Sequence, residues 1–389
     1  MRVLVITKIF PHAADLAGAP YNRHQFAAMA KHCDVDVLGL IPWFPGAQRL
    51  RRTKSASTAA IPYRERIEGL PVAHPRVLYV PKVGHAVAGV TYAASILPYV
   101  AARRGRYDVV LGSFAYPDGW AAVVIARLLG VPAVIKLHGG DINELRKSRL
   151  VLPHLRWALS RAAGVVATSR ALADAAIEVG ARADRTTVIF NGVDMDLFRL
   201  RSRQACREQL GQPTDGRWLV FVGRIETRKG VRELMEAFAK TAREHPDVRL
   251  MMVGGGTEEA ECKAFAEREG LPVVFPGPCS HEDVATWIGA SDLLVLPSHA
   301  EGTPNVVIEA LVSGRRVVAT AVGGIPAVIK DPALGRLVPC GDASALAEAL
   351  GEEVERPYEP EAVKAAAGFG SWDESGRALY DVVERAVRG

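Results

Sequence analysis

Cysteines are few in this chain, and their spacing excludes the usual cysteine-based sites. The five cysteines lie far apart in the sequence, at positions 33, 206, 262, 279 and 340. No two of them form a C-x-x-C pair, so the sequence indicates neither a zinc site nor a framework of disulfides. Scattered thiols are typical of a protein that stays reduced, and we therefore expect a cytoplasmic location.

The chain also lacks a long, uninterrupted apolar segment. The longest candidate, residues 86–102, is rich in alanine and is interrupted by Pro98. A membrane-spanning helix needs about 20 apolar residues, so we interpret this segment as a helix that does not cross a membrane. The sequence begins directly with the apolar run Arg2–Ile6 and shows none of the regions of a signal peptide, so we expect no secretory leader.

Net charge is only +5, but the charges are unevenly distributed. Residues 1–200 carry 26 Lys and Arg against 14 Asp and Glu, whereas residues 201–389 carry 22 against 29. A basic half can attract an anionic partner such as a membrane surface. A local cluster of three arginines and a lysine occupies residues 49–54, although a solvated loop would explain it equally well. The sequence shows no basic stripe or recognition motif for a nucleic acid.

Short apolar runs alternate with helical patterns along the chain. The candidate strands of the first half are Arg2–Ile9, Asp34–Leu40, Val72–Val80, Asp108–Ser113, Ala133–Leu137, Gly164–Ser169 and Thr186–Phe190. Those of the second half are Trp218–Arg224, Arg249–Val253, Val273–Phe275, Asp292–Pro297, Arg316–Thr320 and Arg336–Val338. Runs of Val, Ile and Leu without polar alternation are typical of parallel strands buried on both faces. Their alternation with helices predicts an α/β fold built from doubly wound βαβ units.

The length of 389 residues predicts at least two domains. A turn-rich stretch at 191–194, followed by a charged segment and a fresh strand at Trp218, places the boundary near residue 200. We predict an N-terminal domain over 1–199, a second domain over 200–369, and a C-terminal helix over 370–389 that packs back toward the first domain. Ser371 and Glu374 have the spacing of a capping box at the start of that helix.

The most informative stretch is Ser298–Glu309. It follows the apolar run at 292–296 and opens a helical pattern, so it connects a buried strand to a helix. Pro304 suits a first helical turn, where free backbone N–H groups attract phosphate. Glu301 and Glu309 flank this helix start, where two acids can accept hydrogen bonds from hydroxyls at both ends of a phosphorylated sugar compound. The stretch therefore predicts a nucleotide-sugar site.

A second signal is the stretch Phe221–Gly230, which begins as a strand and leads into a helical pattern over Val231–Arg243. Arg224 stands at the end of the strand and Lys229 just before the helix, so the two cations could clamp a diphosphate from two sides. Glycines at both ends of the stretch allow close backbone approach. A basic pair in isolation is more often a solvated surface pair, but the position at a strand end favours a functional role.

Together these motifs resemble those of the retaining glycosyltransferases with the GT-B fold, in the large family that carries an E-x7-E motif (glycosyltransferase family 4, group 1 type). The stretches that carry the resemblance are Gly223-Arg224-x4-Lys229-Gly230, Val253–Gly256, Glu301-x7-Glu309, Gly323–Pro326, Leu137–Ile142 and Asn191–Asp194. The resemblance covers nearly the whole chain and is weakest over residues 42–100. It implies two doubly wound Rossmann-like domains that face a deep cleft, the first on the acceptor side and the second on the donor side.

The resemblance also implies roles for individual residues. Arg224 and Lys229 would bind the donor diphosphate and its leaving charge, and Glu301 would hold hydroxyls of the transferred sugar. Glu309 would accept hydrogen bonds from the ribose. His138 of the first domain would approach the sugar, although a buried, hydrogen-bonded histidine is the plainer interpretation of this residue taken alone. The residues with implied catalytic roles are Arg224, Lys229, Glu301 and His138.

Further residues are assigned to the donor through their backbone or their place at a strand end. They are Gly302, Thr303, Pro304, Asn305, Val306 and Gly254 in the second half, and Gly18 and Asp141 in the first. Gly254 is explained almost as well by a plain turn between a strand and a helix. Around Gly18 the sequence departs from the family pattern, because Ala19 and Pro20 stand where many members have a glycine pair.

The resemblance implies transfer of a hexosyl or N-acetylhexosaminyl group from a nucleoside diphosphate sugar, with UDP- or GDP-sugars foremost. The acceptor would be a saccharide or a lipid-linked saccharide in surface polysaccharide or glycolipid synthesis. No D-x-D-like carboxylate pair stands at a strand end, which favours a reaction that needs neither a metal nor another cofactor, with the two cations in place of a divalent ion. We expect a cytoplasmic protein, peripheral at the inner face of the membrane, with no nucleic-acid partner.

Three alternatives remain at the level of the sequence. An NAD-dependent oxidoreductase shares the fold class, but it should carry a G-x-G-x-x-G loop after its first strand, and none is present. A sugar-nucleotide epimerase on the same fold would turn over the donor without an acceptor. A non-catalytic protein that binds sugar nucleotides is the third, although the full set of charged site residues argues against lost activity.

Overall fold

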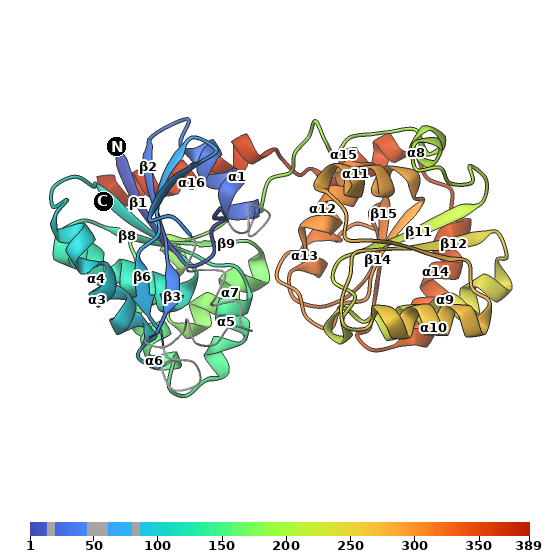
Figure 1. Cartoon of the computed structure of the whole chain (residues 1–389), viewed down its shortest axis with the longest axis horizontal. Coiled ribbons are helices and arrows are strands. Elements are labelled where there is room, and N and C mark those ends of the chain that lie inside the picture. Colours follow the sequence, from blue (N-terminus) through green and yellow to red (C-terminus); the bar gives the residue numbers. More distant parts are fainter. Residues whose placement is uncertain (14–19, 45–60, 80–85) are drawn as a thin grey trace. The chain divides into compact units, whose positions relative to one another are not determined.

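The computed structural model describes residues 1–13, 20–44, 61–79 and 86–389 (Figure 1). The chain forms two compact units, the first made of residues 1–192 and 370–389 and the second of residues 193–369. The division lies seven residues before the position 199/200 expected from the sequence. The reason is a contact between distant parts of the chain, because a Cβ added at Gly192 would lie 2.4 Å from the Cα of Trp372. The end of the first segment is therefore packed onto the start of the C-terminal helix.

The first unit is built on a sheet in the order β10-β9-β8-β7-β1-β2-β5-β4, parallel except for the antiparallel pair β4 and β5. Its strands are β1 (Arg2–Thr7), β2 (Asp34–Gly39), β4 (Arg64–Ile67), β5 (Leu70–Ala73), β7 (Val109–Ser113), β8 (Ala133–Lys136), β9 (Gly164–Ala167) and β10 (Thr186–Val188). Chain order reverses between β1 and β7, which are neighbours. Ligands of open α/β sheets bind beyond the carboxyl ends of the strands at such a point.

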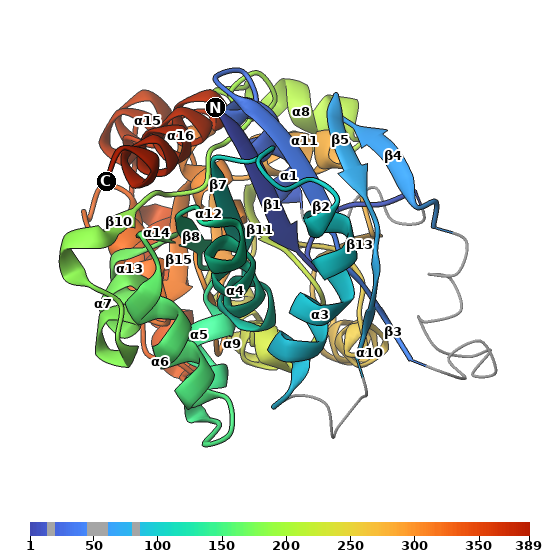
Figure 2. The same ribbon diagram turned by 90° about the vertical axis from the view of Figure 1, so that its left-hand side faces the viewer.

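Both faces of this sheet are buried, as the uninterrupted apolar runs predict. Successive residues of β1 alternate between two cores: Leu4 and Ile6 belong to one, and Val3 and Val5 to the other. The helices of the first unit are α1 (Pro20–Met29), α3 (Ala88–Ala101), α4 (Trp120–Leu129), α5 (Gly140–Asn143), α6 (Leu152–Arg161), α7 (Arg170–Val179) and α16 (Trp372–Arg388). Helix α16 packs beside α1, and α3 packs beside α4, as Figure 2 also shows.

One strand expected from the sequence is divided in the structure. The run Val72–Val80 contains Pro75, and the chain there leaves the main sheet: β5 ends at Ala73, and β6 (Arg76–Leu78) pairs with β3 (Ile41–Trp43) in a separate small sheet. The division follows from chemistry, because proline lacks the N–H group that a central strand needs. The hairpin of β4 and β5 at the edge of the main sheet was not expected from the sequence.

The second unit contains a parallel sheet in the order β13-β12-β11-β14-β15-β16. Its strands are β11 (Arg217–Val222), β12 (Val248–Val253), β13 (Val273–Gly277), β14 (Leu293–Leu296), β15 (Arg316–Thr320) and β16 (Gly335–Val338). Counted from β11, the order is 3-2-1-4-5-6, which is that of the Rossmann fold. The point at which chain order reverses lies between β11 and β14, where Leu219 pairs with Leu293.

Helices cover both faces of this second sheet (Figure 1). They are α8 (Arg203–Gln209), α9 (Val231–Glu244), α10 (Glu259–Glu269), α11 (His281–Ala290), α12 (Asn305–Val312), α13 (Ile325–Val328), α14 (Ala343–Glu355) and α15 (Pro360–Ala367). The two doubly wound α/β domains predicted from the sequence are therefore confirmed. The capping box of the C-terminal helix is also confirmed, since Ser371 and Glu374 exchange hydrogen bonds between their side chains and backbone N–H groups.

Candidate functional site

The candidate donor site lies where the order of the second sheet reverses. The loop after β11 carries Lys229, the loop after β14 carries Glu301, and their side chains meet with Lys229 Nζ 2.6 Å from Glu301 Oε1. Both side chains are largely buried, with exposed fractions of 17% and 10%. An ammonium group has three donors, so Lys229 keeps donors for an anion while it is bonded to Glu301.

A second hydrogen bond holds Glu301 in place. Ser298 Oγ donates to Glu301 Oε1 at 2.6 Å, and the backbone oxygen of Ser298 accepts from the hydroxyl of Thr320 at the end of β15. Ser298 and Thr320 are both buried. The Glu301 carboxylate is thus tied to loops that follow three adjacent strands. Sequence reasoning missed Ser298 and Thr320, although a polar residue at the end of an apolar strand was the available signal.

Glycines allow these loops to pack against one another. Gly230 has φ +66°, and a Cβ there would lie 2.0 Å from the carbonyl oxygen of Pro297. Gly323 has φ +56°, and a Cβ there would lie 1.9 Å from the carbonyl oxygen of Glu301. Side chains are therefore excluded at both positions by backbone conformation and by space. From the sequence, close backbone approach was expected at Gly230, whereas Gly323 was identified only through the family resemblance.

Helix α12 begins beside Glu301. Pro304 precedes its first residue, Asn305, as the N-cap, with φ −72° and ψ +118°, so the proline stands one position before the helical turn expected for it. Gly302 and Thr303 connect Glu301 to this helix start, and Val306 follows on the first turn. The amide groups of a first turn have no intrahelical acceptor, and they give the helix start its affinity for anions.

Arg224 is placed differently from Lys229. Its side chain is 71% exposed, and its guanidinium group makes a long contact of 3.4 Å with the carboxylate of Glu226. Arg228 is also exposed and approaches the same carboxylate at 3.7 Å. The structure therefore brings Lys229, Glu301 and the start of α12 together, and it leaves the Arg224 guanidinium extended on the surface of the loop.

Glu309 lies on the second turn of α12 and is 9% exposed. Its Oε1 is 3.2 Å from Nε2 of His281, whose ring packs edge-on against Phe198 with ring centres 4.9 Å apart. His281 and Phe198 were not identified from the sequence. His281 thus holds the Glu309 carboxylate on the second turn of α12, and Phe198 supports the ring of His281.

Gly254 packs against the backbone of a neighbouring loop. It follows β12 with φ +133°, and a Cβ there would lie 1.9 Å from the carbonyl oxygen of Gly223. The close approach that the glycine permits is therefore to the loop after β11. This contact favours the plain turn that was the alternative interpretation of Gly254 over contact with a ligand.

In the first unit, the predicted residues His138 and Asp141 follow β8. The carboxylate of Asp141 is fully buried and accepts three backbone N–H groups, from His138 at 3.0 Å, Gly139 at 2.8 Å and Ala115 at 2.8 Å. Burial raises the pKa of Asp141, against the effect of these bonds. With its oxygens occupied in this way, Asp141 orders the loop around His138, and direct contact with a ligand is not favoured.

The side chain of His138 is held by groups from neighbouring elements. Its Nε2 lies 2.8 Å from Ser113 Oγ at the end of β7, and its ring lies 5.1 Å from that of Tyr21. Tyr21 and Asn22 lie on the first turn of α1, and neither was identified as a site residue from the sequence. Gly18, the remaining predicted site residue, lies outside the described residues, as does the basic cluster at 49–54.

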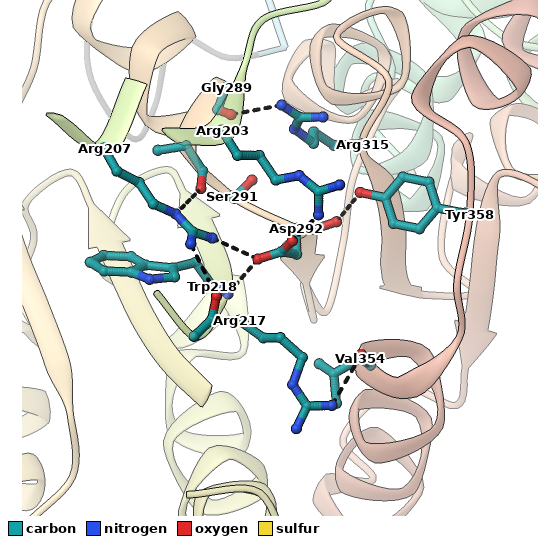
Figure 3. Close-up of polar contacts among 12 residues, drawn as sticks. Arg203, Arg207, Arg217, Trp218, Gly289, Ser291, Asp292, Arg315, Val354 and Tyr358 are labelled. Carbon is teal, nitrogen blue, oxygen red and sulfur yellow. Dashed lines mark hydrogen bonds and ion pairs between the residues drawn. The ribbon is translucent and has the colours of Figure 1, made fainter. Parts of the chain in front are cut away.

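A separate cationic cluster lies at the opposite edge of the second sheet, at the amino ends of β11 and β14 (Figure 3). Arg203 and Arg207 both bond the carboxylate of Asp292, which also accepts the backbone N–H of Trp218 at 2.7 Å. Arg315 is 1% exposed and donates to the carbonyl oxygen of Gly289 at 2.7 Å. These guanidinium groups are bonded within the protein, so we interpret the cluster as structural.

No helix among the described residues combines the length and the apolar character needed to cross a bilayer. Within the same part of the chain, no three side chains of His, Cys, Asp or Glu gather closely enough to hold a metal ion.

Comparison with known families matches both halves of the chain. Residues 202–367 match the family described as glycosyl transferases group 1, and residues 28–197 match glycosyltransferase family 4. A Bacillus subtilis protein named as the teichuronic acid biosynthesis glycosyltransferase TuaC is 29% identical over 368 residues, covering 93% of this chain and 91% of that protein. A D-inositol 3-phosphate glycosyltransferase of Streptomyces scabiei is 32% identical over 313 residues, covering 73% of this chain and 69% of that protein.

Solved structures show the same fold at lower identity. The Anabaena protein HepE in complex with UDP and glucose superimposes with a TM-score of 0.72 at 20% identity, covering 99% of each chain. WaaG, a glycosyltransferase involved in lipopolysaccharide biosynthesis, has a TM-score of 0.64 at 18% identity, covering 100% of this chain and 98% of that one.

Proposed function

The chain belongs to the group 1, family 4 glycosyltransferases and has the GT-B fold, and from this premise we propose that its second unit binds a nucleoside diphosphate sugar whose sugar is transferred with retention of anomeric configuration. The observation that carries the proposal is the meeting of Lys229 and Glu301 at 2.6 Å beside the start of α12. A cation, helix-start amides and an acid at one point of a Rossmann sheet suit a phosphorylated sugar.

The proposed chemistry follows from the charges that develop. When the sugar–phosphate bond breaks, positive character grows on the sugar carbon and negative charge grows on the diphosphate. Lys229 and the first-turn amides of α12 stabilise that negative charge, and Arg224 supplies a second cation when its exposed side chain turns toward the diphosphate. The acceptor hydroxyl attacks from the face that the leaving group vacates, and a phosphate oxygen takes its proton. Glu301 holds sugar hydroxyls and is not proposed as a nucleophile.

We propose a uridine or guanosine diphosphate hexose as the donor and a saccharide or lipid-linked saccharide as the acceptor. The complexes of HepE with UDP and with UDP-glucose support a nucleotide-sugar donor and place UDP-sugars first in a screen. The naming of the Bacillus relative for teichuronic acid biosynthesis supports an acceptor in surface polysaccharide synthesis. The reaction as proposed draws its positive charge from Lys229 and Arg224 and calls for no cofactor.

A panel of sugar nucleotides tests the donor. Binding to the folded state raises stability by RT ln(1 + [L]/Kd), about 2.7 kcal/mol at a hundredfold excess over Kd, so the true donor is expected to raise the melting temperature clearly. Incubation of that donor alone separates a transferase from an epimerase, because only an epimerase would convert it without an acceptor. The anomeric configuration of the product, determined by NMR, tests retention. No stabilisation by any nucleoside diphosphate sugar would count against the proposal.

We expect the substitution Glu309→Gln to weaken binding of the nucleoside diphosphate about 10- to 100-fold, as judged by calorimetry. The reason is that a hydrogen bond to a charged group contributes about 1.5–3 kcal/mol, and the proposed partners of Glu309 are the ribose hydroxyls. A nucleotide without those hydroxyls provides the matched control, since its affinity should be equally low in both proteins. An equal loss of affinity for both nucleotides would show that Glu309 does not bind the ribose hydroxyls.

We propose further that His138 hydrogen-bonds a sugar hydroxyl of the bound substrates. The support is its place after β8, at the carboxyl edge of the first sheet, and its incompletely buried ring held between Ser113 and Tyr21. Loss of the side chain in His138→Ala should lower transfer without changing the affinity for the nucleoside diphosphate alone.

We also propose that the protein is cytoplasmic and binds peripherally to an anionic membrane surface through helix α3 of the first unit. Three exposed apolar residues are spaced along the N-cap and body of α3: the N-cap Val87 at 52%, and Val90 at 50% and Leu97 at 42% within the helix. We call Val87, Val90 and Leu97 the α3 stripe. The stripe ends near a pocket of about 430 Å³ whose lining includes Arg64, Arg66, Arg103 and Arg106.

Charge supports the choice of an anionic bilayer as the partner. Residues 37–107 contain 11 Lys and Arg but only two acids, Glu65 and Glu68. An apolar helix face with arginines at its end is typical of a segment that lies in the interface of an anionic membrane. Each basic residue near such a surface contributes about 1 kcal/mol of attraction, and salt screens it.

The double substitution Val90→Ser and Leu97→Ser is expected to reduce binding to phosphatidylglycerol vesicles at least about tenfold in a flotation assay. Full burial of such a side chain contributes about 1.5–3 kcal/mol to binding. A tenfold loss of affinity corresponds to about 1.4 kcal/mol, so partial insertion of the two side chains is enough to account for it. The matched control is Leu128→Ser on α4, where the leucine is 54% exposed outside the α3 stripe. Equal losses in the control, or no binding of the unaltered protein at low salt, would exclude this surface.

A further inference from the structure

A buried network of hydrogen-bonded polar side chains connects His138 to the interior of the first unit. Lys136 and Asn22 are fully buried, and Lys136 Nζ donates to Asn22 Oδ1 at 3.1 Å. Ser113, also fully buried, donates from Oγ to the same Asn22 oxygen at 3.1 Å and lies 2.8 Å from His138 Nε2. The proposed function uses His138 but gives no role to the three residues behind it.

The positions of the protons in this network follow from the hydrogen-bond partners of Asn22. Its amide nitrogen donates to the carbonyl oxygen of Ile9 at 2.7 Å, and a carbonyl oxygen can only accept. Its oxygen faces Lys136 Nζ, which keeps N–H donors in either protonation state, although burial lowers the pKa of Lys136 to about 7. Both contacts require the same orientation of the amide. The two lone pairs of Asn22 Oδ1 are then filled by Lys136 and Ser113, so the hydroxyl proton of Ser113 points at Asn22.

This assignment determines the state of the histidine ring. Since the Ser113 proton is committed to Asn22, the Ser113 oxygen must accept from His138, and Nε2 must carry a proton. A neutral ring then has its lone pair on Nδ1, which forms no hydrogen bond with the described residues. Burial lowers the pKa of His138 well below its usual value, and the charge of Lys136 lowers it further, so a neutral ring is favoured.

We propose that Asn22, Ser113 and Lys136 are positioning residues that hold His138 with its proton on Nε2, so that Nδ1 accepts a hydrogen bond from a substrate hydroxyl. The inference rests on the proposed function, because it specifies how His138 meets the sugar. It predicts that the substrate group at this point is a hydroxyl acting as a donor. A group that can only accept, such as an ether oxygen or a fluorine in place of the hydroxyl, would be repelled by the lone pair of His138 Nδ1.

The test reads the ring proton directly. In the full-length protein labelled with ¹⁵N-histidine, the Hε2 proton of His138 is expected to be visible, because a buried hydrogen bond slows its exchange with water. The resonance is assigned by its absence in His138→Gln. Ser113→Ala should abolish the signal and lower kcat/KM about tenfold, whereas Ser113→Thr, which keeps the hydroxyl, should restore both. Equal melting temperatures would show that the variants are folded.

Two results would overturn the proposal: a proton on Nδ1 in place of Nε2, or an Hε2 signal that persists in Ser113→Ala. Failure of the proposed function is distinguishable, since unchanged transfer in His138→Ala would remove the catalytic role of His138 while the ring-proton result still stood. Lys136→Met provides a second measurement. The titratable groups around the ring are Lys136, Tyr21 and Asp141, and loss of the lysine charge should raise the pKa of His138; an unchanged pKa would contradict the placement of Lys136.

Discussion

Replacement of Lys229 by alanine is expected to lower the turnover number about 10²- to 10³-fold, which is the loss typical for one donor that stabilises a developing oxyanion. The effect should be large because the Lys229 side chain is only 17% exposed and its ammonium group is held by a 2.6 Å bond to Glu301. A cation held in place in a poorly solvated site stabilises charge without having to reorganise during the reaction. Steady-state kinetics with saturating donor measures this loss.

The neighbouring Arg228 provides the matched control for this experiment. It precedes Lys229 directly and carries the same charge, but its side chain is 59% exposed and lies 3.7 Å from Glu226. Arg228→Ala should therefore leave turnover near that of the unaltered enzyme. Near-normal transfer in Lys229→Ala, or equal losses in both variants, would remove the specific cation from the proposed mechanism. Thermal melting is needed alongside, because loss of Lys229 also leaves the Glu301 carboxylate without its cation.

Substitution of Arg224 by alanine should lower the turnover number by a similar factor, but without the change in stability expected for Lys229→Ala. The side chain of Arg224 is 71% exposed, so its substitution removes no buried contact and should leave the melting temperature unchanged. A transition-state role predicts a lower turnover number, whereas a role in donor capture alone predicts a higher KM with unchanged turnover. The two variants together thus separate a fixed cation from one that engages only when the donor is bound.

Substitution of Asp292 by alanine is expected to destabilise the second unit by about 3–5 kcal/mol. Removal of one partner from a buried ion pair leaves an uncompensated charge, and the side chain of Arg207, bonded to Asp292 at 2.8 Å, is only 5% exposed. The same carboxylate holds Arg203 and the backbone of Trp218, so several contacts are lost at once (Figure 3). Urea denaturation followed by tryptophan fluorescence measures the change, since Trp218 is fully buried in this unit.

Asp247 offers the comparison for this second prediction. It also pairs with an arginine at the start of β11, Arg217, at 2.6 Å, but it is 50% exposed. Asp247→Ala should therefore cost only about 0.2–1 kcal/mol, as solvent-exposed ion pairs do. At a temperature where both variants are folded, donor affinity should be unchanged, because the cluster lies at the sheet edge opposite to the candidate site. A small loss of stability in Asp292→Ala would contradict the structural interpretation.

Much of the fold and of the donor site could be predicted from the sequence because their signals are local. Apolar runs of five or six residues identify strands buried on both faces. The single strand predicted over Val72–Val80 was wrong because Pro75 interrupts the pairing there. Lys229, Glu301 and Glu309 each stand beside a strand end or on the helix that follows it, which chain order alone reveals. The division at Val193 could not be predicted, since it depends on Gly192 packing against Trp372, 180 positions later.

By itself, the sequence determined the fold class, the family and the edge of each sheet at which the candidate site residues lie, because periodicity and turn residues act over a few neighbouring positions. Only the tertiary structure decided which side chains meet. It paired Lys229 with Glu301, placed Asp141 and Gly254 against the backbone, and joined Asn22, Ser113 and Lys136 behind His138. The reason is that strands adjacent in a sheet can be far apart in the chain, so contacts between the loops that follow them depend on strand order and packing and leave no local pattern in the sequence.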